Sequence, residues 1–377
     1  MSDDTPVRAD TLLSDGEQIR SPGIRSSPPT RRPNTALTPA DESELAAWQA
    51  RTVPQPTRIG PDLSVIPVPA PRLAVGYTLC YVIQDDDGVR LIDPGLGTPA
   101  GWEALTRGLQ ELGSDVTQVR GVIATHAHPD HTGLIGRVRE ASDAWFALGE
   151  AEPLPPASQN DEHIVQDDGL LATWGVPAEQ RPGLNVYRFA IPSAGLGNPN
   201  VTLADGDEVP GGGLVTVSSP GHTNGHICLR TKDGSFLFTG DHVLPRIVPH
   251  VSVALDSGTD PLGAYRESLT KLAPYSAAIV CPAHEYRFWG LAARLRQLEE
   301  TVTARTGHVE AIILEDHPDT VWKIAQRMTW SRGWEGLAGM DRRLAVAEAA
   351  SHVERLHHIH GLRTLPPTRP ASLPSMP

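Results

Sequence analysis

The sequence predicts an α/β fold in which β-sheets form the inner layers of a sandwich and helices cover the outside, followed by a small helical C-terminal domain. Apolar segments of strand length alternate with segments of helical periodicity along most of the chain. Four of the strand-like segments also end in histidine or aspartate. The ends of strands are where α/β sheets place their chemistry, so a functional site is expected at one edge of the sandwich.

Composition limits the classes of protein to be considered. The 377 residues leave room for two domains, and 39% hydrophobic residues suffice for a large core. The net charge of −13 disfavours a nucleic-acid partner, which usually needs a basic face. Cys80, Cys228 and Cys281 lie in apolar runs, which is typical of reduced, buried thiols in a cytoplasmic protein. We expect no membrane span and no secretory signal, because no apolar stretch suits either.

The N-terminal segment 1–36 is expected to be a disordered tail, because it contains few large apolar residues. A catalytic domain is expected to follow at 37–289. Its first element is predicted to be a helix that runs to about Ala50, with Thr38 as the capping residue and Pro39 in the first helical position.

The next segments alternate between strands and a helix. Strands are expected at 64–69, 77–83 and 90–92, with a hairpin turn at 85–88. The third strand ends at Asp93, which either caps a turn or orients a metal-binding histidine. Thr98 and Pro99 are expected to begin a helix that ends at Leu112.

The densest group of polar side chains follows the apolar run 119–124. His126, His128, Asp130 and His131 lie within six residues, between this predicted strand and a predicted helix. Alternate residues of an extended turn point the same way, so His126 and His128 can converge on one point while Asp130 and His131 face a neighbouring point. Crowded imidazoles are costly when charged, and neutral imidazoles facing a divalent cation avoid that cost. The pattern predicts a metal site.

Three later strand-like runs each deliver one further ligand-type side chain, namely His222, Asp241 and His284. The irregular segment 150–196 separates them from the first group. It is expected to carry a short helix near 164–174 and to border a substrate pocket. Three additional histidines accompany these strand ends: His226 is expected to be structural, whereas His242 and His250 either meet substrate or line the core.

Helices dominate the rest of the chain. Asp260 and Pro261 are expected to begin one that ends near Ala273. The C-terminal domain is placed at 290–365 and the final tail at 366–377. This domain is expected to contain helices from Leu291 to about Gly307, from a cap at Asp319 and from Asp341 to His358, and a short strand at 361–365. Four histidines in it are interpreted as surface residues: His352, His357, His358 and His360.

Taken together, these segments resemble the metallo-β-lactamase superfamily. The resemblance rests on H-A-H-P-D-H at 126–131, P-G-H-T-N-G-H at 220–226, T-G-D-H at 239–242 and P-A-H at 282–284, with Asp93 matching the family's first motif. It covers about residues 60–290 and implies a four-layer αββα sandwich. The C-terminal part resembles a small winged-helix-like domain appended to some members. Such a domain could hold nucleic acid, but a packing role beside the active site suits the acidic chain better.

The resemblance also implies a set of metal ligands. One metal would be held by three histidines, a second by two histidines and an aspartate, and one carboxylate would bridge the two ions. In this sequence the sets are His126, His128 and His222; Asp130, His131 and His284; and the bridging Asp241. Antibiotic-hydrolysing members generally lack the bridging carboxylate, whereas members resembling glyoxalase II, the lactonases and the nucleases of this fold have it.

These ligands predict a metal-dependent hydrolase. Two cations that share one water would lower its pKa, and the resulting metal-bridging hydroxide would attack the carbonyl of a thioester, ester or lactone. Asp130 is the expected catalytic residue, because it can both bind metal and orient that hydroxide. The two ions are expected to be zinc, with iron or manganese also compatible. The expected partner is a small-molecule or acyl-carrier substrate.

Two other activities fit the same residues. A phosphodiesterase or ribonuclease could use the same two-metal site, and a sulfur dioxygenase would hold a single iron with much of the same ligand set. A binding module without catalysis is disfavoured, because all seven ligand positions are filled. The sequence predicts neither the substrate nor the oligomeric state.

Overall fold

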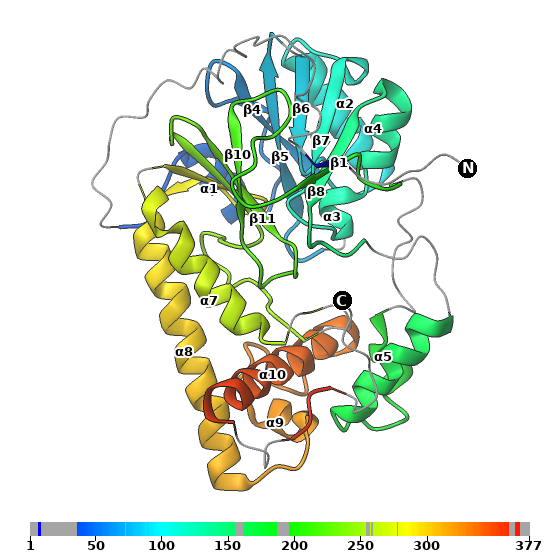
Figure 1. Cartoon of the computed structure of the whole chain (residues 1–377), viewed down its shortest axis with the longest axis vertical. Coiled ribbons are helices and arrows are strands. Elements are labelled where there is room, and N and C mark those ends of the chain that lie inside the picture. The colour runs from blue at the N-terminus through cyan, green and yellow to red at the C-terminus, as the bar shows by residue number, and fades with distance from the viewer. Residues whose placement is uncertain are drawn as a thin grey trace.

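The computed structural model describes residues 7–8, 36–71, 73–86, 88–154, 161–186, 196–253, 257, 259–276, 278–361 and 366–369. Two β-sheets pack face to face in the upper part of the molecule, and a group of helices lies below them (Figure 1). The long helix α8 runs from one part into the other. The predicted α/β sandwich with a helical C-terminal region is therefore confirmed.

Within the described residues, the first sheet has eight strands in the order β1-β9-β8-β7-β6-β5-β4-β3. Its strands are β1 (Val7–Arg8), β3 (Thr57–Arg58), β4 (Leu63–Pro69), β5 (Tyr77–Asp85), β6 (Gly88–Ile92), β7 (Val119–Ile123), β8 (Trp145–Gly149) and β9 (Val201–Leu203). The predicted hairpin joins β5 to β6, where Asp85 pairs with Gly88. From β6 to β9 the strands are parallel, so their carboxyl ends meet at one edge of the sheet.

The second sheet, as far as the structure describes the chain, has six strands in the order β10-β11-β12-β13-β14-β2. They are β2 (Thr38–Pro39), β10 (Leu214–Ser218), β11 (Ile227–Thr231), β12 (Phe236–Gly240), β13 (Ile279–Pro282) and β14 (Phe288–Trp289). The two central strands β12 and β13 are parallel. Both of them therefore end at the same edge of this sheet.

Three apolar layers hold the sandwich together. Leu79, Phe238 and other fully buried side chains fill the space between the two sheets. On the outer face of the first sheet lie α2 (Pro99–Glu111) and α4 (Ile135–Ser142), which bury Leu105 and Ile135. On the outer face of the second sheet lie α1 (Glu42–Gln49), α7 (Pro261–Leu272) and the first half of α8 (Leu291–Asp316). This is the αββα order of layers.

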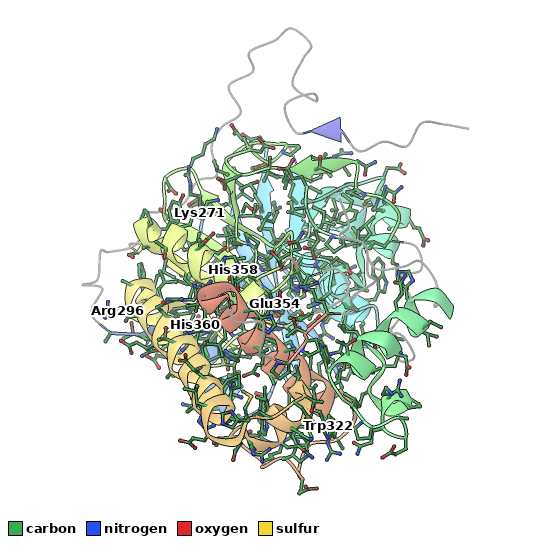
Figure 2. All side chains as sticks on the ribbon, turned by 60° about the horizontal axis from the view of Figure 1, so that its bottom comes forward. Lys271, Arg296, Trp322, Glu354, His358 and His360 are labelled. Atoms are coloured by element: carbon green, nitrogen blue, oxygen red, sulfur yellow. The ribbon has the colours of Figure 1, made fainter. Side chains whose placement is uncertain are left out.

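The helical region has an apolar core of its own, built from two separate stretches of the chain. The later stretch supplies the end of α8, α9 (Val321–Arg327) and α10 (Gly339–His360). The earlier stretch supplies α5 (Asp161–Thr173) and α6 (Arg181–Leu184), and the fully buried Trp174 follows α5. In Figure 2, which shows this end of the molecule, Trp322 lies on α9, and His358 and His360 lie on α10. The predicted domain boundaries at 289 and 365 stay predictions.

At the N-terminal end the structure differs from the sequence prediction. Thr38 and Pro39 do not begin a helix; they form β2, in which Thr38 pairs with Trp289. Helix α1 begins at Glu42, because the side chain of Asp41 accepts a hydrogen bond from the backbone N–H of Ser43 and caps the helix there. Two residues of the expected tail, Val7–Arg8, form β1 beside β9. The other residues of that tail up to 35 lie outside the described part of the chain.

The C-terminal helices also correct several expectations. Helix α8 does not end near Gly307 but continues to Asp316, since Val309 and Ile312 are buried in the helical core and outweigh the roughly 1 kcal/mol cost of a helical glycine. Thr320 rather than Asp319 caps α9. The strand expected at 361–365 falls almost wholly on residues that the structure does not describe.

His352 is the clearest error of the sequence interpretation, because it is buried rather than at the surface. Its Nδ1 lies 2.9 Å from Oγ1 of Thr306 on the neighbouring helix α8. His357 is half-buried, whereas His358 and His360 are exposed as expected. The periodicity of α10 explains the difference, since His352 lies on the helix face that carries the buried Ala349 and Val353.

The three cysteines are buried and free, as the sequence predicted. Among the helices of the described residues, none combines the length and the apolar character needed to cross a bilayer.

Candidate metal centre

The predicted ligands come together at the edge where the two sheets end their parallel strands. The first sheet supplies His126, which follows β7, and the short helix α3 (Pro129–Thr132) begins just after His128. The second sheet supplies His222 from the loop between β10 and β11, Asp241 directly after β12, and His284 shortly after β13. Asp130 and His131 lie on α3 itself, so strand ends, loops and this short helix together bring all seven side chains to one place.

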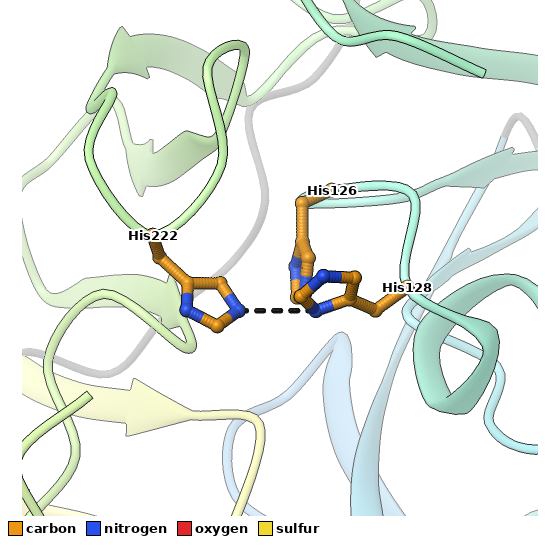
Figure 3. A group of neighbouring side chains, drawn as sticks. All are labelled: His126, His128 and His222. Carbon is orange, nitrogen blue, oxygen red and sulfur yellow. Dashed lines mark hydrogen bonds between the residues drawn. The ribbon is translucent and has the colours of Figure 1, made fainter. Parts of the chain in front are cut away.

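Three histidines form the first group (Figure 3). Nε2 of His126 lies 2.9 Å from Nδ1 of His128, and Nε2 of His222 lies 3.1 Å from the same Nδ1 atom. His126 is fully buried, whereas His128 is partly open to solvent. The three rings meet with their nitrogens inward, which is the arrangement that a cation needs.

Asp130, His131 and His284 form the second group. Nε2 of His284 lies 3.4 Å from Oδ2 of Asp130, and Nε2 of His131 lies 3.9 Å from Oδ1 of Asp130. Asp241 lies between the two groups: its Oδ1 is 3.2 Å from Nε2 of His284, and its Oδ2 is 3.7 Å from Nε2 of His222. One carboxylate therefore faces both groups.

The unpaired atoms of the centre test whether a metal ion fits. Among the described residues, Nε2 of His131, Nε2 of His284 and Oδ1 of Asp241 are buried and have no hydrogen-bond partner. Oδ1 of Asp241 lies 3.6 Å from Nε2 of His131 and 3.2 Å from Nε2 of His284. Buried polar atoms without partners are costly. Coordination of a cation would satisfy all three, so the residues fit the divalent metal that the fold implies.

The two groups of ligands differ in the direction in which their surroundings shift the pKa values of the histidines. Burial keeps the pKa of His126 well below its ordinary value and also lowers the pKa of His222. Desolvation of the ring, together with the neighbouring His222, lowers the pKa of His128 to about 4. These three imidazoles are therefore neutral at pH 7 and offer free lone pairs to a cation.

The second group is surrounded by carboxylates. Burial would lower the pKa of His284, but the charge of Asp241 outweighs it and raises this pKa to about 10. Burial also opposes ionisation of Asp130, yet His131 and His284 hold the pKa of this carboxyl well below its usual range. Asp130 is thus an ionised acceptor at neutral pH.

Several ligand histidines are oriented by contacts to the ring nitrogen that faces away from the centre. Asp93 accepts from both the N–H and the hydroxyl of Thr125 at 2.8 Å, and its Oδ2 lies 3.0 Å from Nδ1 of His131. The structure therefore favours the orienting role of Asp93 over the turn cap. The backbone carbonyl of His250 lies 2.7 Å from Nδ1 of His222, and that of Tyr77 lies 2.9 Å from Nδ1 of His284. Such contacts select the ring nitrogen that faces the metal.

The extra histidines behave differently from one another. His226 is fully buried, and its Nδ1 lies 2.9 Å from Oγ of Ser219, which agrees with the structural role expected of it. His242 is also fully buried and packs against Tyr265, with ring centroids 4.6 Å apart, so its side chain belongs to the core. His250 touches the centre through its backbone carbonyl.

The sequence interpretation missed Glu152 entirely. This buried carboxylate follows β8 and accepts hydrogen bonds from both ligand-bearing loops. It lies in the irregular segment that was expected only to border a pocket. No periodicity or motif marks it, so only the folded structure reveals its position.

Comparison with known proteins agrees with this geometry. A family model described as the Metallo-beta-lactamase superfamily matches residues 73–284, more than half of the chain. The probable metallo-hydrolase YqjP of Bacillus subtilis is 25% identical over 78% of this chain and 92% of its own. A hydroxyacylglutathione hydrolase of Albidiferax ferrireducens is 24% identical over 67% of this chain and 79% of its own. The crystal structure of the metallo-beta-lactamase family protein TTHA1429 from Thermus thermophilus is 27% identical, with a TM-score of 0.67, and covers 80% of this chain and 95% of its own.

Proposed function

The chain belongs to the metallo-beta-lactamase superfamily, and from that premise we propose that it hydrolyses a thioester, ester or lactone with the help of two divalent metal ions. The observation that carries the proposal is the position of Asp241. Its two carboxylate oxygens lie 3.2 Å from His284 Nε2 and 3.7 Å from His222 Nε2, so one side chain serves both ligand groups. The ligands of the two ions would be His126, His128 and His222 for one, and Asp130, His131 and His284 for the other.

Bound divalent ions would supply acidified water and neutralise the negative charge that develops on the carbonyl oxygen. The protein contributes orientation. Asp130 is ionised at neutral pH, and the hydroxyl of Thr78 donates to its backbone carbonyl at 2.9 Å, which fixes the turn that carries it. An ionised carboxylate in this place can accept a hydrogen bond from the attacking water and aim it at the carbonyl carbon. No serine or cysteine nucleophile is needed.

An apolar loop beside the centre supports an acyl substrate. Ile247 and Val248 are exposed on the loop that ends with His250, the residue whose carbonyl faces His222. Arg294 holds this loop through hydrogen bonds to the carbonyls of Leu244 and Ile247, at 2.6 and 2.7 Å. A rigid apolar surface suits the hydrocarbon part of an acyl group better than a phosphodiester backbone. The hydroxyacylglutathione hydrolase among the relatives acts, by its name, on a thioester of this general kind.

The nature of the ions follows from their donors. Imidazole and carboxylate together suit zinc, iron or manganese, and zinc is our first expectation. The test is the metal content of protein purified without added metal, combined with assays on a thioester, a lactone and a phosphodiester. Two zinc ions with thioester or lactone turnover support the proposal. Phosphodiester cleavage alone would favour a nuclease, and one iron with oxygen uptake would favour the dioxygenase.

A further inference from the structure

Glu152 lies where the backbone that follows β8 packs directly against the loop between β10 and β11. It follows β8 of the first sheet, and the neighbouring loop belongs to the second sheet. The approach is so close that a Cβ atom on Gly225 would lie 2.0 Å from the backbone nitrogen of Glu152. A Cβ atom on Gly149 would likewise lie 2.2 Å from the carbonyl oxygen of Gly225. The two glycines permit this backbone contact, and Glu152 lies within it.

The carboxylate of Glu152 accepts three hydrogen bonds from two loops. Its Oε1 accepts from the N–H of Ala127 at 2.8 Å. Its Oε2 accepts from the hydroxyl of Thr223 at 2.7 Å and from the N–H of Gly225 at 2.9 Å. A carboxylate can accept all three, because each of its oxygens has two lone pairs and it carries no proton of its own.

The donors are next to the ligands of one metal only. Ala127 lies between His126 and His128, and Thr223 follows His222. These three histidines form the first ligand group, and they come from different sheets. The backbone of Ile227 also donates to the carbonyl of Thr125 at 2.9 Å, so the sheets are joined without Glu152. What Glu152 adds is a fixed distance between the loop of His126 and His128 and the loop of His222.

We propose that Glu152 is a positioning residue that sets the affinity of the three-histidine site, and of that site alone. The proposal rests on the proposed two-metal function. Glu152 accepts these hydrogen bonds from two backbone N–H groups and one hydroxyl of the loops that carry His126, His128 and His222, so its effect passes through these two loops. Residues that orient metal ligands from behind typically change metal affinity by roughly 10- to 100-fold when they are replaced.

Glu152→Gln tests this proposal with little change in size. The amide keeps one acceptor oxygen but turns an NH2 group toward a donor, so at least one loop loses its bond. Zinc is titrated into metal-free protein against a chromogenic chelator, and cobalt is added separately to follow the absorption of each site. We expect affinity for one of two ions to fall roughly 10- to 100-fold while the other ion binds as in the wild type. Glu150→Gln, an exposed change in the same turn, is the matched control and should leave both affinities unchanged.

Several outcomes would overturn the proposal. Unchanged affinities in Glu152→Gln, or an equal loss for both ions, would show that Glu152 supports the fold without selecting a site. If that variant fails to fold, Thr223→Val removes only the hydrogen bond from the Thr223 hydroxyl and should still lower the affinity for one ion severalfold. Wild-type affinity for both ions in Thr223→Val would then contradict the proposal. A wild-type protein that binds no metal would overturn the proposed two-metal function as well. A wild-type protein that binds two ions, with Glu152→Gln unchanged, would overturn only the positioning role of Glu152.

Discussion

Histidines gather in two regions of this molecule, and the two groups have little in common. Around the metal centre, imidazoles come from several separate elements and face shared points, and among the described residues Nε2 of His131 and Nε2 of His284 are buried there without a hydrogen-bond partner. Along α10, four histidines come from a single helix and point in different directions. His352 is buried against Thr306, and His360 is paired with Glu310 at 3.0 Å. Convergence from separate elements, rather than the number of histidines, marks a metal site.

The largest expected effect comes from breaking the convergent group at its centre. Asp241→Ala should lower turnover by about three orders of magnitude, or roughly 4 kcal/mol of transition-state stabilisation, because no carboxylate would then face both ligand groups. Bound metal should fall from two ions per chain toward one. Steady-state kinetics and elemental analysis measure the two effects, and Asp130→Ala should behave similarly. Full activity in Asp241→Ala would rule out the two-metal mechanism.

His352 tests this contrast between the two groups of histidines, because it is buried but should not affect metal binding. His352→Ala should lower the free energy of unfolding by about 2 kcal/mol, since it leaves a cavity and removes the hydrogen bond between His352 and Thr306. Urea unfolding of the metal-free protein gives this value. Metal content should stay at the wild-type level, and its loss would show that the helical region contributes to the centre.

The same residue should make stability depend on pH. Burial, together with the positive charge of Arg305, lowers the pKa of His352 to about 3, so this side chain stays neutral in the folded protein. The unfolded chain binds the proton below about pH 6.5, and stability is therefore present above that pH and is lost as the pH falls toward 3. Between pH 7 and pH 5 the wild type should lose about 2 kcal/mol more than His352→Asn. Parallel losses in both proteins would contradict the assignment.

The smallest effect is expected at the exposed end of α10. His358→Ala should change the free energy of unfolding by less than about 0.5 kcal/mol and leave turnover and metal content unchanged, because the side chain is exposed. Thermal unfolding and the thioester assay are sufficient tests. Loss of most of the activity would show that the C-terminal histidines meet the substrate after all.

Local patterns predicted much of the fold. The apolar runs around β4, β5 and β7 lie where the sequence placed them, and Thr98 and Asp260 cap the helices that they were expected to cap. The errors arise where a distant partner decides the outcome. Thr38 is in a strand because Trp289 pairs with it, and α8 passes Gly307 because a second core buries its end.

The candidate site divides in the same way. The sequence motifs predicted seven ligands, and the structure places all seven at one edge of the sandwich. A strand end followed by a turn constrains where a side chain points, which is why local patterns could predict them. The supporting contacts could not be found in this manner. Glu152 acts on backbone N–H groups of loops that lie 25 and 73 residues away, and no spacing in the sequence records such a contact.

The discontinuous helical region has a consequence for how the protein is made. Trp174 leaves the ribosome long before its partners: Trp322 donates its backbone N–H to the carbonyl of Trp174, and the indole N–H of Trp174 donates to the carbonyl of Thr368. Until α9 and α10 have been synthesised, Trp174 and the neighbouring Leu170 and Leu171 lack most of the core that buries them. This part of the molecule can therefore complete its folding only after α9 and α10 have been synthesised, and a shortened chain that ends before α9 would expose an apolar surface prone to aggregation.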